Sequence, residues 1–201
     1  MKKQLIVFVF LLSTVVIYAQ KMKVSNGNFK NLKGIATFNL EFDYSEIQIP
    51  KYDSEEDFLE DKMAKREKKE AGKGEKFKKS WFADRSNKYE PKFIESFNKR
   101  FKDSKVRVGR DFKDAKYIIK IHTTKLYAGY NVGVVRHNAE IDAVITIYEA
   151  ENPSNILLSG KYKDVQGNGA MGNDYDSGYR ISECYAKLAK NIAKSIKKAS
   201  K

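Results

Sequence analysis

Residues 115–148 read AKYIIKIHTTKLYAGYNVGVVRHNAEIDAVITIY, and this stretch decides the fold. Apolar and polar side chains alternate over residues 115–126 and again over residues 139–148, a pattern typical of strands with one buried face. The connection between them, residues 127–138, contains two glycines. The pattern therefore predicts an antiparallel pair of strands with a polar outer face.

The chain after this pair predicts one more strand and a long helix. Asn-Pro-Ser-Asn at residues 152–155 is a turn signal, and residues 156–165 are typical of a strand. Apolar residues then recur at steps of four, three, four and four: Ile181, Tyr185, Leu188, Ile192 and Ile196. This spacing predicts an amphipathic helix. Such a basic helix could also lie on a membrane, but its apolar stripe is needed to cover the sheet.

The chain before the pair predicts a strand, a helix and a further short strand. Apolar and polar residues alternate over residues 34–44, and Val106 and Val108 indicate the short strand. Pro91 suits the first turn of a helix. Four apolar residues follow it at helical spacing: Phe93, Ile94, Phe97 and Phe101. An aromatic stripe with this spacing favours core packing over nucleic-acid stacking, so no specific nucleic-acid site is predicted.

Residues 53–80 differ in composition from the rest. Asp, Glu and Lys dominate the helical part, residues 53–74, where the large apolar residues are Phe58, Leu59 and Met63. Too little apolar surface remains for a core helix, so the segment is predicted to be a charged, solvent-exposed helical insertion. A mobile lid or partner-binding arm is the functional alternative.

Together these elements predict an α+β fold. Two main helices on one face of a mostly antiparallel sheet of about four strands form a two-layer sandwich, with the charged insertion added. The chain length suits one domain, assigned to residues 20–201.

The first nineteen residues predict a secretory signal peptide. Lys2 and Lys3 precede an apolar run over residues 5–17, and Ala19 offers a small residue for cleavage. The run is shorter than the roughly 20 residues of a membrane-spanning helix, which disfavours an uncleaved anchor. The sequence therefore predicts an exported protein, periplasmic or secreted, without a transmembrane segment in the mature chain. No Cys lies near the cut, so a lipoprotein is not expected.

Charge and cysteine content narrow the functional classes. The formal net charge is +13, which favours polyanionic partners, but 32 Lys against 7 Arg fits a solubilising surface equally well. Cys184 is the single cysteine and excludes an intrachain disulfide. It falls on the apolar side of the last predicted helix, which indicates a buried, inert thiol.

No residue cluster amounts to a catalytic, metal or cofactor signature. Residues 167–172 match G-x-G-x-x-G, but the next helix begins several residues later and no second strand follows. Asp174 and Asp176 could bind calcium only with ligands that are missing, and Asp176 or Ser177 is better placed to cap the last helix. His122 and His137 could approach each other, but two histidines do not define a zinc site.

Four segments support a resemblance at the level of pattern. They are the signal segment, residues 35–38 (IATF), residues 114–120 (DAKYIIK) and the closing helix with Ala186, Ala189 and Lys190. The chain resembles the lipopolysaccharide-assembly outer-membrane lipoprotein and related small cell-envelope domains, in which two helices pack on a four-stranded sheet. The resemblance implies a non-enzymatic accessory of a Gram-negative cell envelope. Those proteins often carry a lipid-bearing Cys after the signal, which this chain lacks.

The resulting hypothesis is an exported, non-enzymatic binding or assembly module. Its partner would be an envelope protein or an anionic glycolipid, and the protein could also lie at the periphery of the outer membrane. The alternatives are a binder of lipopolysaccharide, acidic glycan or nucleic acid, and an envelope-directed hydrolase using the two histidines. Tyrosine combines apolar area with a polar tip, which favours loop tyrosines as contacts. The candidate binding residues lie in or beside two loops, residues 127–138 and 167–178: Tyr127, Tyr130, Arg136, His137, Tyr175 and Tyr179.

Overall fold

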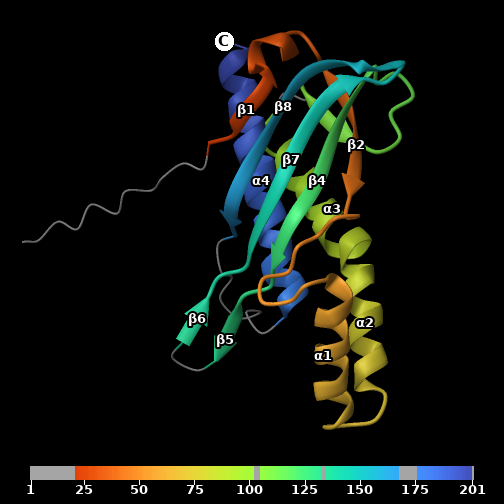
Figure 1. Ribbon diagram of the computed structural model, residues 1–201. Coiled ribbons are helices and arrows are strands. Elements are labelled where there is room, and N and C mark those ends of the chain that lie inside the picture. Colours follow the sequence, from red (N-terminus) through yellow and green to blue (C-terminus); the bar gives the residue numbers. More distant parts are fainter. Residues whose placement is uncertain (1–20, 102–104, 133–134, 168–175, 201) are drawn as a thin grey trace, which may run out of the picture.

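The computed structural model describes residues 21–101, 105–132, 135–167 and 176–200. The predicted signal peptide, residues 1–19, lies outside the described residues. The described chain has an α+β fold in which helices pack against a six-stranded mixed sheet (Figure 1).

The sheet is built around the predicted antiparallel pair. Its strands lie in the order β1 (Lys23–Gly27), β8 (Asn152–Gln166), β7 (Glu140–Glu149), β4 (Tyr117–Tyr127), β2 (Thr37–Asp43) and β3 (Arg107–Gly109). β4 and β7 pair antiparallel, with Ile121 opposite Ile145. The alternation that predicted these strands is therefore confirmed.

The sheet has six strands rather than the expected four or so, and it is mixed: three of its five strand pairs are antiparallel and two are parallel. β2 pairs in parallel with both β3 and β4, because the helices between β2 and β4 supply the long crossover that a parallel pair requires. β1 was missed because its five residues are all exposed and carry no alternating pattern. The predicted turn at residues 152–155 belongs to β8, which begins at Asn152.

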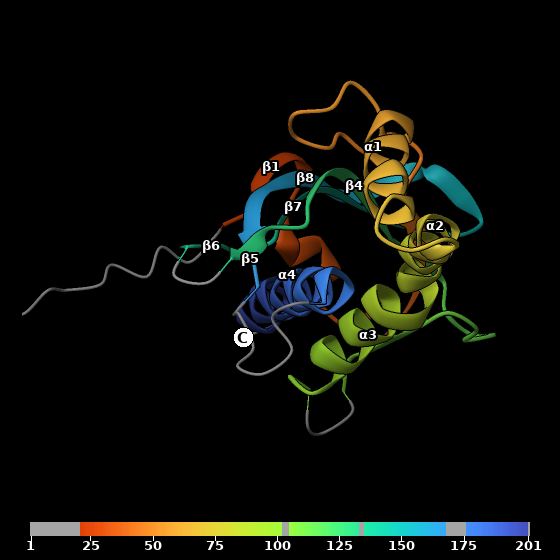
Figure 2. The same ribbon diagram turned by 90° about the horizontal axis from the view of Figure 1, so that it is seen from below.

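Two helices cover one face of the sheet, as predicted. α3 (Glu90–Asn98) and α4 (Ser177–Ala199) lie side by side on this face in both views (Figures 1 and 2). The apolar stripe of α4 is fully buried, and Tyr185 from α4 hydrogen bonds through its hydroxyl to the hydroxyl of Thr123 in β4, at 2.7 Å. This stripe packs against β7 and β8 and forms one side of the core.

The other sheet face is polar. Lys120 in β4 forms ion pairs with Glu41 and Asp43 in β2, both at 3.0 Å. Thr146 and Ser159 lie opposite each other in β7 and β8 on the same sheet. These contacts confirm the predicted polar outer face.

The charged insertion is two helices rather than one. α1 (Glu55–Glu67) and α2 (Lys73–Asp84) form a hairpin, which continues through the π-helical turn η2 (Arg85–Tyr89) into α3. The expected lack of core packing is wrong for Phe58 and Leu59, which are 6% and 5% exposed, because Trp81 from α2 covers Phe58.

Two smaller elements complete the described chain. The 3-10 turn η1 (Phe29–Leu32) follows β1, and Leu32 joins the core. The connection between β4 and β7 forms a two-stranded ribbon of β5 (Tyr130–Val132) and β6 (Val135–His137). Gly129 leads into it with φ +61°, and a Cβ there would lie 2.4 Å from the carbonyl oxygen of His137, so only glycine fits.

Candidate functional site

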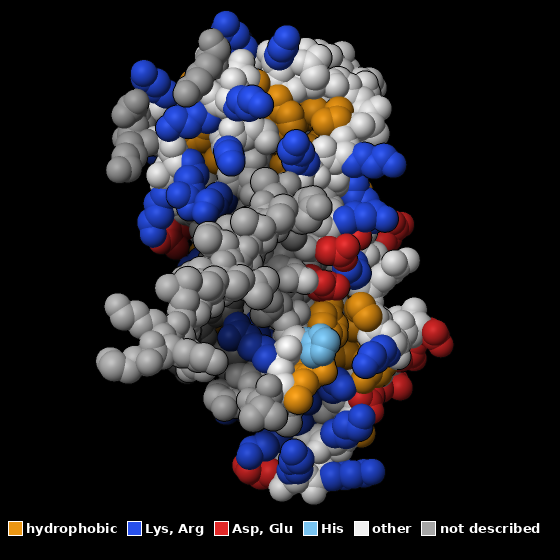
Figure 3. Space-filling model, turned by 90° about the vertical axis from the view of Figure 1, so that its left-hand side faces the viewer, with side chains coloured by type: hydrophobic (Ala, Val, Ile, Leu, Met, Phe, Trp, Pro, Cys, Tyr) orange, Lys and Arg blue, Asp and Glu red, His pale blue; other side chains and the backbone are white. Residues whose placement is uncertain are grey.

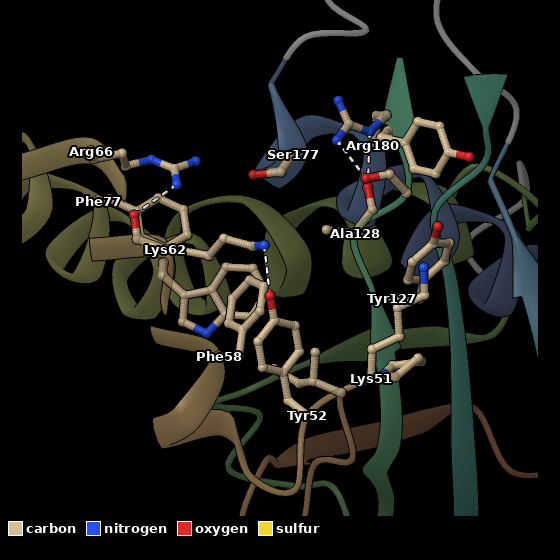
Figure 4. Close-up of a pocket in the computed structure, with 15 residues that line it drawn as sticks. Lys51, Tyr52, Phe58, Lys62, Arg66, Phe77, Tyr127, Ala128, Ser177 and Arg180 are labelled. Carbon is tan, nitrogen blue, oxygen red and sulfur yellow. Dashed lines mark hydrogen bonds between the residues drawn. The ribbon is translucent and has the colours of Figure 1, made fainter. Parts of the chain in front are cut away.

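The α1–α2 hairpin and the β5–β6 ribbon extend from the same end of the sheet (Figure 1). Between them lies a cleft of about 310 Å³, which we call the aromatic cleft (Figure 4). Its walls come from residues 49–52, both hairpin helices, the end of β4 and the start of α4. The lining residues are Ile49, Pro50, Lys51, Tyr52, Phe58, Lys62, Arg66, Phe77, Trp81, Tyr127, Ala128, Gly129, Tyr130, Ser177 and Arg180.

Aromatic rings form the hairpin side of the cleft. Phe58 and Trp81 pack with ring centroids 4.7 Å apart, and Tyr52 meets Phe58 edge-on at 5.3 Å. Phe77 adds a ring 6.0 Å from Trp81. Helical spacing creates this wall, since Phe77 and Trp81 are four residues apart and share one side of α2. The wall can stack against a flat or apolar ligand.

Basic side chains complete the cleft: Lys51, Lys62, Arg66 and Arg180. Among the described residues, no Asp or Glu lines it. The aromatic cleft therefore combines apolar rings with an excess of positive charge.

Arg66 is the most informative of these cations. Its guanidinium lies 3.8 Å from the ring centroid of Phe77, and its Nη1 donates to the carbonyl oxygen of Lys62 at 3.0 Å. Within the described ranges, no carboxylate pairs with it. Burial lowers the pKa of Arg66. A partly desolvated guanidinium without a carboxylate is poised to pair with an anion from outside the protein.

Lys62 is held at the centre of the cleft by a hydroxyl and a carboxylate. Its Nζ lies 2.7 Å from Tyr52 Oη and 3.1 Å from Asp61 Oδ2, and Figure 4 shows the ammonium directed toward Tyr52. Tyr52 Oη in turn donates to Asp61 Oδ2 at 2.6 Å. Desolvation alone would lower the pKa of Lys62, but the contacts with Tyr52 and Asp61 outweigh it and raise that pKa. Lys62 therefore stays charged.

The other two cations differ in their freedom. Arg180 is 9% exposed and donates from Nε to the carbonyl oxygen of Ala128 at 2.9 Å, which ties α4 to the end of β4. Lys51 is exposed and adopts φ 73°, a left-handed conformation that is unfavourable for a residue with a side chain. Arg180 therefore holds two walls of the cleft together, and Lys51 lies at the rim with a strained backbone.

Glu55 fixes the hairpin beside the cleft. Its Oε1 accepts a hydrogen bond from Trp81 Nε1 at 2.7 Å and pairs with Arg85 Nη2 at 2.5 Å. Arg85 lies in η2, so one carboxylate joins α1, α2 and the π-helical turn. These contacts orient Trp81, whose side chain forms part of the aromatic wall.

Two of the six candidate binding residues line the cleft: Tyr127 and Tyr130. Burial raises the pKa of Tyr127. His137 in β6 packs against Tyr130 with ring centroids 4.7 Å apart and the rings tilted, next to exposed Arg136. Tyr179 lies outside the cleft lining, with its ring 5.9 Å from Lys92 Nζ, and Tyr175 falls outside the described residues.

The two histidines, which could have approached each other, lie in different sheets. His122 pairs with Val144 in the six-stranded sheet, whereas His137 pairs with Tyr130 in the separate ribbon. In the part of the chain that the structure describes, no three His, Cys, Asp or Glu side chains gather as a metal site would require.

The remaining sequence candidates have structural roles where they are described. Asp176 accepts from the backbone N–H of Gly178 at 2.8 Å and caps α4, as predicted. Cys184 is fully buried, also as predicted, and burial raises the pKa of its thiol to about 12. Residues 168–175, with most of the glycine-rich motif and Asp174, fall outside the described residues.

The hairpin side of the cleft was missed by the sequence argument, although a signal was present. Phe58, Lys62 and Arg66 follow one another at steps of four and therefore share one face of α1. Phe77 and Trp81 have the same spacing in α2. A search for aromatic and basic residues on a common helix face would have found both.

No protein-family model, curated protein or solved structure matches this chain. None of the helices within the described ranges is long and apolar enough to cross a membrane.

Proposed function

We propose that this chain is an exported binding protein whose aromatic cleft holds a small ligand with an apolar, ring-like body and a negative charge. The observation that carries the proposal is Arg66, a partly buried guanidinium on an aromatic wall, without a carboxylate partner among the described residues. Charge-assisted hydrogen bonds to such a cation are about twice as strong as neutral ones.

The dimensions and fixed walls of the cleft support this proposal. A volume of about 310 Å³ lies at the lower end of the range for small-molecule sites. Trp81 is oriented by Glu55, and Lys62 by Tyr52 and Asp61, so these walls are ordered before a ligand arrives. Preorganised groups lose less entropy on binding.

The proposed role is non-enzymatic and places the protein in the periplasm or outside the cell. The signal-like segment at residues 1–19 supports export. The separation of His122 and His137 into different sheets favours binding over hydrolysis. An envelope protein or an anionic glycolipid remains the partner class that the resemblance suggests.

Binding of a polyanion is a second candidate function, favoured by one surface. The upper part of the face shown in Figure 3 carries Lys and Arg side chains without visible Asp or Glu. Binding there would weaken steeply as salt is raised, because neutralising a polyanion releases counterions.

The test of the cleft is calorimetric titration of the mature protein with naphthalenesulfonate, and with neutral naphthol for comparison. We expect the sulfonate to bind more tightly, and Arg66→Gln to weaken it about tenfold. Trp81 is the single Trp, so its indole N–H gives one NMR signal that should shift when the cleft is occupied.

Arg107→Gln is the matched control. Arg107 also lies over an aromatic ring, that of Phe112 at 5.3 Å, but in edge strand β3 away from the cleft. Equal sulfonate affinity in wild type, Arg66→Gln and Arg107→Gln would contradict the proposed site. So would binding that leaves the Trp81 signal unmoved.

A further inference from the structure

A second groove, of about 480 Å³, adjoins the aromatic cleft. It runs between α2 and the start of α4, and we call it the basic groove. The two hollows share Arg66, Phe77, Trp81 and Ser177, so one ligand can occupy both. The other residues that line the basic groove are Lys73, Lys76, Ser80, Asp84, Lys88 and Asp176.

The cations of the basic groove fall into two pairs. Lys88 lies 3.0 Å from Asp84 and 2.8 Å from Asp176, and Lys73 pairs with Glu70, so internal carboxylates neutralise these two. Arg66 and Lys76 have no carboxylate partner among the described residues. Two positive charges of the groove therefore remain for a ligand.

Hydroxyl groups flank the same two cations. Ser177 points into the space between the hairpin and the end of the sheet, as Figure 4 shows, and Ser80 lies one turn after Lys76 on α2. A guanidinium, an ammonium and hydroxyl donors are the groups that a phosphate monoester uses, since it has three terminal oxygens and a charge of about −1.5 to −2 at neutral pH.

We infer that the ligand is a phosphate monoester of an apolar body, with the body in the aromatic cleft and the phosphate beyond Arg66 in the basic groove. This inference rests on the proposed function and names its ligand class. A sulfonate or carboxylate carries one negative charge and would leave one of the two cations unpaired. A phosphate monoester neutralises both.

The test compares naphthyl phosphate, naphthalenesulfonate and naphthol on the full mature protein by calorimetry. We expect naphthyl phosphate to bind about tenfold more tightly than the sulfonate at neutral pH. The advantage should shrink at pH about 5, because the second phosphate pKa is about 6. Lys76→Gln should lower the affinity for naphthyl phosphate more than that for the sulfonate, and so remove most of the advantage.

Lys79→Gln is the control, because Lys79 is an exposed lysine on the same helix that lines neither hollow. Equal affinity for phosphate and sulfonate in wild type would overturn the inference and leave the proposed function standing. A phosphate advantage that survives in Lys76→Gln would also overturn it. If neither anion binds, both the inference and the proposed function fail.

The phosphate could belong to a soluble ester or to a lipid headgroup, and vesicles separate these sources. Phosphatidylcholine vesicles that contain phosphatidic acid offer the same monoester on a membrane, and vesicles of phosphatidylcholine alone are the control. Co-sedimentation that requires phosphatidic acid and is reversed by naphthyl phosphate would support the inference with a lipid source. Tight naphthyl phosphate binding without co-sedimentation would support it with a soluble one.

Discussion

Helix α4 and the α1–α2 hairpin are both rich in lysine, yet they are held to the rest of the protein in different ways. α4 buries apolar residues along almost its whole length, from Ile181 to Ile196. α1 buries only Phe58 and Leu59, and α2 buries Trp81. The large buried apolar surface of α4 therefore holds this helix in place, whereas a few individual contacts hold the hairpin.

The difference explains where a binding site can form. A helix whose apolar face is fully buried against the sheet has no apolar surface left for a ligand. The hairpin keeps Phe77, Lys62 and Arg66 only partly buried, and its ion pairs fix its position without covering them. The weakly amphipathic helix pair thus forms one wall of the aromatic cleft, while the strongly amphipathic helix α4 packs into the core.

The largest effect should come from a matched pair of Leu→Ala substitutions. Leu188→Ala in α4 should lower the free energy of unfolding by about 3 kcal/mol, since Leu188 is 0% exposed and the cavity would be enclosed. Leu59→Ala in α1 should cost about 1–2 kcal/mol, because Leu59 borders a surface groove and its site can relax or admit water. Urea unfolding followed by circular dichroism measures both.

This pair can break the comparison directly. Equal losses would mean that the hairpin is as much a part of the apolar core as α4. A loss in Leu59→Ala confined to hydrogen exchange of hairpin amides, with α4 amides still protected, would sharpen the comparison instead.

A smaller effect is expected from Glu55→Gln. The neutral amide can still accept from Trp81 but loses the ion pair with Arg85, in which the two side chains are 21% and 19% exposed. We expect a loss of about 1–2 kcal/mol and a shift of the Trp81 indole signal. Glu95→Gln is the control, because Glu95 pairs with Lys99 on an exposed helix surface where such pairs contribute little. An unmoved Trp81 signal would show that Glu55 does not orient the wall.

The same contrast explains which parts of the fold the sequence predicts. α4, β4 and β7 were predicted because the apolar residues of each element repeat regularly, at helical spacing in α4 and at every second residue in the strands. In each element these residues are buried together. β1 and the parallel pairing of β2 depend on contacts with distant segments, which no local pattern records. Phe58 was assigned to an exposed segment because its partner Trp81 comes from another helix.

The candidate site shows a similar division. Tyr127 and Tyr130 were predicted as contacts because tyrosines in a loop combine apolar area with a polar tip, and both line the cleft. The opposite side depends on the α1–α2 hairpin folding back toward the end of β4. Lys51 and Arg66 become site residues only through that tertiary arrangement, so composition alone gave them no role.

The smallest expected effect is the loosening of the cleft wall when acid protonates Asp61. Asp61 accepts hydrogen bonds from Lys65, Tyr52 and Lys62, and these contacts hold the pKa of Asp61 well below its ordinary value of 3.8. A carboxylate with a lowered folded-state pKa contributes fully above its unfolded value, and that contribution is lost as pH falls through the folded one. Acid well below pH 3.8, where the folded carboxylate takes up its proton, should therefore loosen Tyr52 and Lys62 while α4 keeps its circular dichroism signal.

Naphthalenesulfonate is the suitable probe of this effect, because the sulfonate stays ionised throughout the acid range. We expect its affinity to fall as Asp61 is protonated, by less than the fall in Arg66→Gln, because Asp61 acts only by positioning Tyr52 and Lys62. Asp61→Asn should show the reduced affinity already at neutral pH and a flatter acid profile. An Asp61→Asn profile that parallels wild type would mean that the hairpin wall is held by its aromatic contacts alone, and the contrast with α4 would be one of degree.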